Sequence, residues 1–130
     1  MDKAQVAQII EEGNAVFGCE LGSTRIKATL ITPQGEPLAS GSYGWENRYE
    51  NGVWTYDMDD VRTGMAACFE DLFRDVEKSY GVTPKRFAAG GVSGMMHGYI
   101  ALDEEGNLLV PFRTWRNNIT GEASEKLTAV

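Results

Sequence analysis

The longest hydrophobic pattern in the chain predicts a helix over residues 58–80. Apolar side chains recur there at spacings of three and four, which is the period of an amphipathic helix. Asp57 precedes the run, Asp60 follows three residues later as in a capping box, and Gly81 stands where a helix would end. The periodic residues are Val61, Met65, Cys68, Phe69, Leu72, Phe73, Val76 and Tyr80. We expect this stripe to pack in the core.

Alternation of apolar and polar residues predicts a strand over residues 25–31. A shorter apolar run precedes it over residues 15–21, and a third run occupies residues 38–43. Three consecutive strands joined by tight turns form an antiparallel meander. The apolar run 87–92 follows the long helix, so we expect a buried strand beside the first one and parallel to it.

The N-terminal arm and an aromatic loop have weaker patterns. Residues 1–14 form an arm in which Asp2 caps a short amphipathic helix. Residues 44–56 form a loop rich in aromatic side chains. We expect Trp45 to cover the sheet, and Trp54 is open to a role in a pocket.

The C-terminal third predicts a hairpin and a last helix. Strands are expected over residues 99–102 and 108–115, around a turn rich in acids and glycine. Thr120 stands where it would cap a helix beginning at Gly121. That helix is still periodic near residue 130, so we expect residues 1–130 to be the N-terminal portion of a longer protein.

Composition narrows the classes of function. The 130 residues are 42% hydrophobic and carry a net charge of −7, which argues against binding to nucleic acid. No apolar run has the length of a membrane span, and the N-terminus is not a secretory signal. A single histidine makes a structural zinc site improbable. We expect Cys19 and Cys68 to be free, buried thiols of a cytoplasmic protein.

The turn after the first strand offers groups for an anionic ligand. Glu20 ends the apolar run, and Gly22, Ser23 and Thr24 follow before the second strand begins. A carboxylate, two hydroxyls and backbone N–H groups suit an anion that is held together with a divalent cation. The alternative is an ordinary hairpin turn with a glutamate facing solvent.

A second turn, residues 93–98, follows the predicted parallel strand. Ligands of such sheets gather at the carboxyl ends of the strands. We expect the first strand to end at Glu20 and the fourth at Ser93. If these strands are neighbours, Glu20, residues 22–24 and the second turn face one cleft. The order of meander, helix and parallel strand is typical of the N-terminal half of a ribonuclease-H-like α/β domain, the fold of actin- and hexokinase-type ATPases.

These motifs resemble the N-terminal domain of the FGGY family of carbohydrate kinases. The resemblance extends from Ala15 to the end of the chain, and its most specific part is the Met96-His97 loop, which resembles xylulose and ribulose kinases. The matching segments are Glu20-Leu21-Gly22-Ser23-Thr24 with Lys27, Gly91-Val92-Ser93-Gly94-Met95-Met96-His97-Gly98, Asp103 to Gly106, and Thr114-Trp115-Arg116-Asn117.

The resemblance implies ATP-dependent phosphorylation of a sugar hydroxyl, with ATP and Mg²⁺ as cofactors and a ketose as the acceptor. It places Gly22, Ser23, Thr24 and Lys27 near the ATP phosphates. Glu20 would orient Mg²⁺ through water. Met96, His97 and Trp54 would line the sugar site, with His97 hydrogen-bonded to a hydroxyl.

The chain departs from the family pattern at two places. The family usually has Asp where Glu20 stands, and it has a Trp-x-Asp-x-Arg pattern where Asn117 and Ile119 stand here. The catalytic base of the family lies beyond residue 130, so we expect no catalytic residue in this chain and negligible phosphate transfer by it alone.

Two other functions compete with this one. The first is an actin-like nucleotide sensor or interaction module that has no sugar substrate, and the second is a purely structural domain. An exposed sheet edge in an isolated N-terminal portion also predicts self-association.

Overall fold

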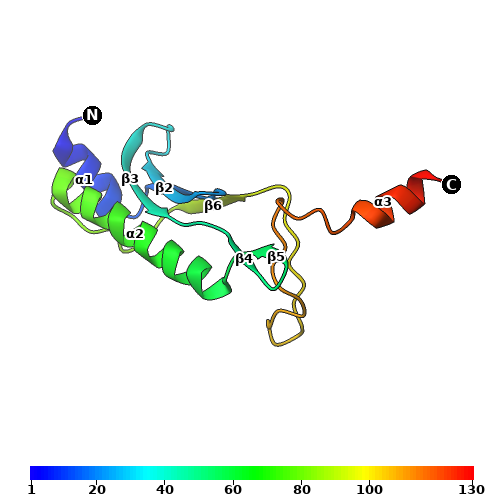
Figure 1. Ribbon diagram of the computed structural model, residues 1–130. Coiled ribbons are helices and arrows are strands. Elements are labelled where there is room, and N and C mark those ends of the chain that lie inside the picture. Colours follow the sequence, from blue (N-terminus) through cyan, green and yellow to red (C-terminus); the bar gives the residue numbers. More distant parts are fainter. The chain divides into compact units, whose positions relative to one another are not determined.

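The computed structural model describes all 130 residues and shows a mixed α/β fold (Figure 1). Its elements are α1 Lys3–Glu11, β1 Val16–Leu21, β2 Arg25–Ile31, β3 Pro37–Gly44, β4 Arg48–Glu50, β5 Val53–Thr55, α2 Met58–Tyr80, β6 Ala89–Gly94 and α3 Gly121–Thr128. The chain divides into two units. The sheet unit comprises Met1–Glu46 and Asp59–Met95, and the loop unit comprises Asn47–Met58 and Met96–Val130.

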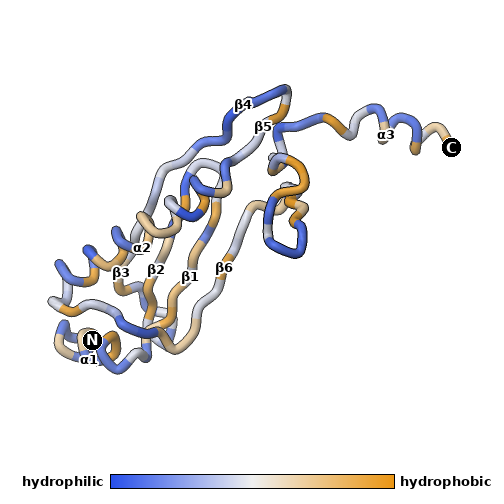
Figure 2. Tube along the Cα trace, turned by 90° about the horizontal axis from the view of Figure 1, so that it is seen from below, coloured by the Kyte–Doolittle hydropathy of each residue, from blue (hydrophilic) through white to orange (hydrophobic).

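The sheet unit is built on a four-stranded sheet with the order β3-β2-β1-β6. The strands lie side by side in this order in Figure 2. β1, β2 and β3 form an antiparallel meander, and β6 pairs with β1 in parallel. The predicted meander, long helix and parallel strand are therefore confirmed.

Alternation along β2 separates the two faces of the sheet. Ile26 and Leu30 are fully buried on the face that packs against α2, where Leu72 and Val76 are also fully buried. Of the predicted apolar stripe of α2, Cys68, Leu72 and Val76 are buried in the core, and the other members are half-buried. The helix lies very close to β3, because a Cβ added to Gly41 would be 2.3 Å from the carbonyl oxygen of Cys68.

Helix ends largely follow the sequence signals. Asp2 and Gln5 form a capping box at the start of α1, and Gly81 ends α2 with a φ of +72°. The prediction that Thr120 caps α3 is wrong. Its backbone is already helical, with φ −83° and ψ −2°, and its side chain makes no capping hydrogen bond. A capping side chain normally needs an extended backbone to reach back to the first N–H groups.

The two edges of the sheet differ. At β3, the N–H groups of Ser40 and Ser42 donate to the carboxylates of Asp75 and Asp71 on α2, at 2.9 and 3.0 Å. At the other edge, every residue of β6 is exposed, so the prediction of a buried strand is wrong. β6 pairs with β1 alone and consists of small residues and Val92, and it is pale in the hydropathy colouring of Figure 2.

The loop unit contains a short hairpin that was expected to be an irregular loop. β4 and β5 pair antiparallel around Asn51 and Gly52, whose φ angles are 51° and 81°. Positive φ at both central residues defines the Asn-Gly type I′ turn, which matches the twist of paired strands. The aromatic residues that favoured a loop are part of this hairpin. Tyr49 and Trp54 are a cross-strand pair with ring centroids 5.2 Å apart.

The hairpin predicted over residues 99–115 is only partly regular. Asp103 accepts the Asn107 N–H at 2.7 Å, so the turn is confirmed. The two predicted strands are reduced to isolated bridges that join Tyr99 to Arg113 and Leu102 to Leu108. Two residues lie between the bridges on one side and four on the other, so the segments cannot keep one register. Pro111 lies in the longer segment and has no N–H to donate.

Candidate functional site

The carboxyl end of β1 places three polar side chains in one row. β1 ends at Leu21 and β6 at Gly94, one residue beyond the ends expected from the sequence. Glu20 lies opposite Lys27 on β2 and opposite Ser93 on β6. Ser93 therefore belongs to the strand and not to the turn that follows it. The predicted neighbourhood of the first and fourth strands is confirmed.

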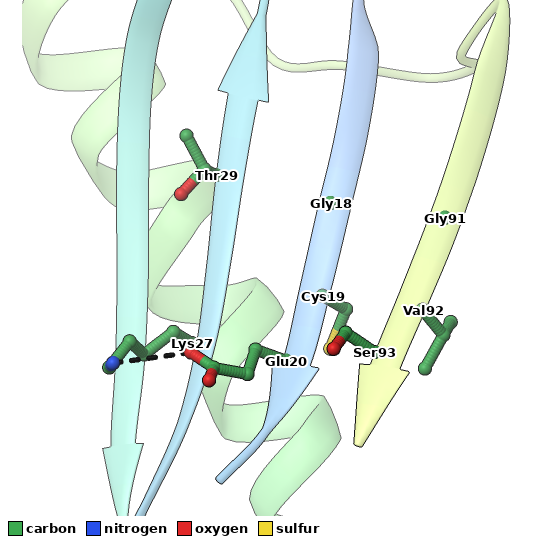
Figure 3. A pocket seen from close by; sticks show the side chains of 8 residues that line it. All are labelled: Gly18, Cys19, Glu20, Lys27, Thr29, Gly91, Val92 and Ser93. Carbon is green, nitrogen blue, oxygen red and sulfur yellow. Dashed lines mark hydrogen bonds and ion pairs between the residues drawn. The ribbon is translucent and has the colours of Figure 1, made fainter.

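A groove of about 460 Å³ lies over this row. Figure 3 shows it from the sheet face opposite α2, with the Glu20 and Lys27 side chains joined by an ion pair. Its lining residues are Gly18, Cys19, Glu20, Lys27, Thr29, Gly91, Val92 and Ser93. The glycines leave the sheet surface bare, so that carboxylate, ammonium and hydroxyl groups are its main chemical features.

The ion pair in the groove is open to exchange. The Lys27 ammonium lies 3.2 Å from the Glu20 carboxylate, and about half of each side chain is exposed. Pairs of this kind contribute little to stability. An anionic ligand could therefore replace Glu20 as the partner of Lys27, and the Glu20 carboxylate could then bind a cation. One carboxylate beside hydroxyl groups suits a hydrated Mg²⁺ that obtains its other ligands from phosphate oxygens.

The turn from Gly22 to Thr24 is held by Trp45. The indole N–H of Trp45 donates to the Gly22 carbonyl at 2.7 Å, and its backbone N–H donates to the Thr24 carbonyl at 3.2 Å. The side chain is 7% exposed, as expected for a covering residue. Gly22 donates its own N–H to Arg25, and a Cβ there would lie 2.8 Å from the Arg25 oxygen. Fixing this turn is a role of Trp45 that the sequence pattern did not reveal.

The two cysteines of the sheet unit are buried and free, as expected. Burial raises the pKa of Cys19. Burial, together with the nearby Cys19, raises the pKa of Cys68 to about 11. Both groups are therefore protonated thiols near neutral pH, and neither has the thiolate that a nucleophile or metal ligand requires.

The loop unit has a larger cavity, of about 840 Å³, with His97 on its wall. Its lining residues are His97, Gly98, Tyr99, Ala101, Leu109, Val110, Arg113, Thr114, Trp115, Asn117, Ile119 and Thr120. Its volume is that of a small-molecule site, and apolar groups with a few polar ones are the usual lining of such a site. The sequence motif already contained Trp115 and Asn117, but no signal singled out Arg113.

Only one of the three predicted sugar-binding residues lines this cavity. Met96 is 85% exposed and lies outside the lining. The Trp54 ring contacts Tyr49 at an interplanar angle of 52°, and the Arg116 guanidinium lies over it, 4.6 Å from the ring centroid. Trp54 therefore has a visible packing role within the loop unit.

Asn117 joins two segments of the loop unit through its amide. Its Oδ1 accepts the Trp54 N–H at 2.8 Å, and its Nδ2 donates to the carbonyls of Trp54 and Thr114 at 2.7 and 3.1 Å. A carboxylate could make only the first of these bonds. Asn117, which stands where the family usually has Asp, therefore makes two hydrogen bonds here that Asp could not make.

The meander, α2 and parallel β6 define a ribonuclease-H-like α/β fold. The sequence matches the N-terminal domain of the FGGY family of carbohydrate kinases over residues 15–129. The chain belongs to this family. α1 lies outside the matched range, although it contributes Val6 and Ile10 to the core of the sheet unit.

The chain is also similar to individual kinases over most of its own length. A glycerol kinase of Citrifermentans bemidjiense is 29% identical over 114 residues, which are 86% of this chain and 22% of the relative. A xyloylose kinase from Brucella ovis superposes with a TM-score of 0.74 at 24% identity, over 88% of this chain and 24% of that one. Plasmodium falciparum glycerol kinase with ADP gives 0.72 at 14% identity, over 89% and 23%. The chain thus spans about a quarter of the length of these proteins.

Two further findings bear on the site. No helix is long and apolar enough to cross a membrane. The chain has no group of three or more His, Cys, Asp or Glu side chains placed to hold a metal ion. The expectation that Glu20 and His97 face one cleft stays a prediction, because they belong to different units.

Proposed function

We propose that this chain is the N-terminal part of an ATP-dependent kinase that phosphorylates a hydroxyl of a sugar, with a ketose such as xylulose or ribulose as the first candidate. Membership of the FGGY family over residues 15–129 carries the proposal. Two free, buried cysteines fit the reducing cytoplasm as the place of this reaction.

The groove at the end of β1 is the proposed phosphate site. Phosphoryl transfer requires that phosphate oxygens are held and their charge is offset, mainly by positioned donors and Mg²⁺. The Gly22–Thr24 turn and Lys27 would approach the phosphates, and Glu20 would orient the hydrated Mg²⁺. The solved relative with ADP supports nucleotide use. When bound, Mg²⁺ would neutralise charge on the transferred phosphoryl group.

The cavity around His97 is the proposed acceptor site. A neutral imidazole has one donor and one acceptor nitrogen, so it can either donate a hydrogen bond to a hydroxyl or accept one from it. Trp115 offers an aromatic surface at the same cavity, with 54% of its residue area exposed. The acids at the start of α2 belong to a helix terminus, and we assign none of them as the catalytic base.

A sugar-binding assay tests this proposal on the full-length protein that carries this chain. We expect His97→Ala to weaken ketose binding about ten-fold or more, the effect of a lost hydrogen bond together with an unpaired partner. Glu105→Ala, in the exposed turn, is the matched control and should bind normally. Glu20→Gln should raise the Mg²⁺ concentration needed for turnover, and Glu11→Gln should not.

The outcomes separate the competing functions. Nucleotide binding without binding of any pentulose, hexulose, polyol or sugar acid would show a sensor or interaction module and overturn the proposal. The 130-residue chain alone should transfer phosphate negligibly. Ordinary kinase turnover by the purified 130-residue chain in a coupled assay would contradict the absence of a catalytic base from this part of the protein.

A further inference from the structure

Arg113 lines the His97 cavity, and its charged side chain has no partner within residues 1–130. Its backbone is fully used, because its N–H and carbonyl pair with those of Tyr99 at 3.1 and 3.0 Å. Its Nε is buried and makes no hydrogen bond. Its guanidinium makes no ion pair in the described chain, although most other arginines of the molecule pair with acids or stack on rings.

An arginine in this state has unused binding capacity. The guanidinium is always charged, and its planar fork of N–H donors matches the two oxygens of a carboxylate. A buried N–H without an acceptor is destabilising, and an anion at this place would supply the missing acceptor. No acidic residue of this chain lines the cavity, so no side chain within residues 1–130 balances the charge of Arg113.

The other lining residues of the cavity favour a singly charged anion that also carries hydroxyl groups. Arg113 is the single permanently charged residue of the lining. One positive charge balances one carboxylate, whereas a phosphate monoester carries nearly two negative charges at neutral pH. His97 and Asn117 add polar groups for hydroxyls, and Trp115 and Tyr99 add apolar surface.

We propose that the acceptor of this kinase is a sugar acid, whose carboxylate pairs with Arg113 while His97 contacts a hydroxyl. This inference rests on the proposed kinase function of the site and replaces its first candidate, a neutral ketose, with an acidic acceptor. Arg113 would then be the residue that selects the acid over the neutral sugar or polyol of the same length.

The test measures binding of D-gluconate, D-glucitol, D-xylulose and D-gluconate 6-phosphate to the full-length protein by calorimetry. We expect gluconate to bind at least about ten-fold more tightly than glucitol. Arg113→Met should weaken gluconate binding about ten- to hundred-fold and glucitol binding less than about three-fold. Arg113→Lys keeps the positive charge but lacks the planar fork of N–H donors. Its affinity for gluconate should lie between those of the parent and of Arg113→Met. Arg62 has an exposed side chain on α2, so Arg62→Met is the control and should bind gluconate and glucitol like the parent.

Each result decides between the proposals. Tighter binding of D-xylulose than of D-gluconate, equal affinity for D-gluconate and D-glucitol, or an equal loss of these last two in Arg113→Met would overturn the inference and leave the kinase assignment intact. A preference for the phosphorylated acid would also overturn it. Absence of binding and phosphorylation for all four compounds would count against the proposed function itself. If Arg113→Met fails to fold, as judged by circular dichroism, Arg113→Lys still decides, because it must lose part of the preference for the acid.

Discussion

The sheet unit and the loop unit use their apolar residues in different ways. In the sheet unit, Ile26, Leu30, Leu72 and Val76 are fully buried between strands and helix. Of the buried hydrophobic residues of the whole chain, only Tyr56 and Phe112 belong to the loop unit. The loop unit instead exposes large apolar side chains: Tyr49, Met96, Tyr99, Ile100, Leu102, Leu109, Trp115, Ile119, Leu127 and Val130.

This difference separates a scaffold from a recognition surface. The sheet unit satisfies its backbone through long ladders and keeps polar residues at one strand end, where a bound ligand would find rigid groups. The loop unit is held by isolated bridges and side-chain clips, such as the Asn117 amide, and it surrounds the larger cavity. Substitutions should therefore affect stability strongly in the first unit and binding strongly in the second.

The largest effect is expected where α2 crosses β3. A Cβ at position 41 would lie 2.3 Å from Cys68 O and 2.4 Å from Leu72 N, both in the helix backbone. Because a helix backbone cannot yield locally, we expect Gly41→Ala to cost about 5 kcal/mol or more in the free energy of unfolding. Gly44→Ala in the same strand has nothing within 4 Å and is the matched control. A cooperative unfolding transition of Gly41→Ala at the parental denaturant concentration would contradict the observed packing.

A pair of leucines tests the comparison directly. Leu72 is fully buried in the sheet unit, and Leu109 is 65% exposed in the loop unit. Leu72→Ala should lower the free energy of unfolding by about 3 kcal/mol, because it leaves a cavity in the core. Leu109→Ala should change it by less than about 0.5 kcal/mol. Denaturant titration measures both, and equal losses would remove the distinction between scaffold and recognition surface.

Asn117→Asp tests whether the amide is a structural clip. At neutral pH, a carboxylate would lose both donated bonds and would lie against the carbonyls of Trp54 and Thr114. We expect a local cost of about 1–3 kcal/mol, confined to the loop unit. The Thr114 amide donates to the same Trp54 carbonyl at 3.1 Å, and its hydrogen exchange should accelerate because the new carboxylate would repel that carbonyl. Amides of the sheet unit such as Leu30 should keep their protection. Unchanged exchange at Thr114 would show that the Asn117 amide does not hold this segment.

The same contrast explains which features could be predicted from the sequence. Regular periods in α2 and β2 report burial against a single neighbouring layer, and the sheet unit follows them closely. The end of β6 and its exposure were predicted less well. Six small or apolar residues do not reveal whether another element covers the strand. In the loop unit, the roles of Arg113 and Asn117 depend on contacts between segments far apart in the chain, and no local pattern encodes these.

The smallest expected effect concerns the protected edge of β3. The Ser42 N–H and then Arg74 hold the pKa of Asp71 below its usual range. The unfolded chain binds this proton more readily, so the stabilisation is complete above the usual carboxyl pKa and is lost as the pH falls through the lower folded value. Asp71→Asn should therefore be slightly less stable than the parent near pH 6, and this difference should vanish towards pH 2.

Glu70→Gln, at the neighbouring exposed position of α2, is the control. Asp71→Asn should also weaken the cover over the strand edge, because the amide is a poorer acceptor for the Ser42 N–H than the carboxylate. Uncovered N–H groups at an edge favour pairing with another chain. Light scattering should therefore detect more self-association in Asp71→Asn than in Glu70→Gln. A difference in stability that is the same at both pH values would show that the charge of Asp71 does not contribute to holding this edge.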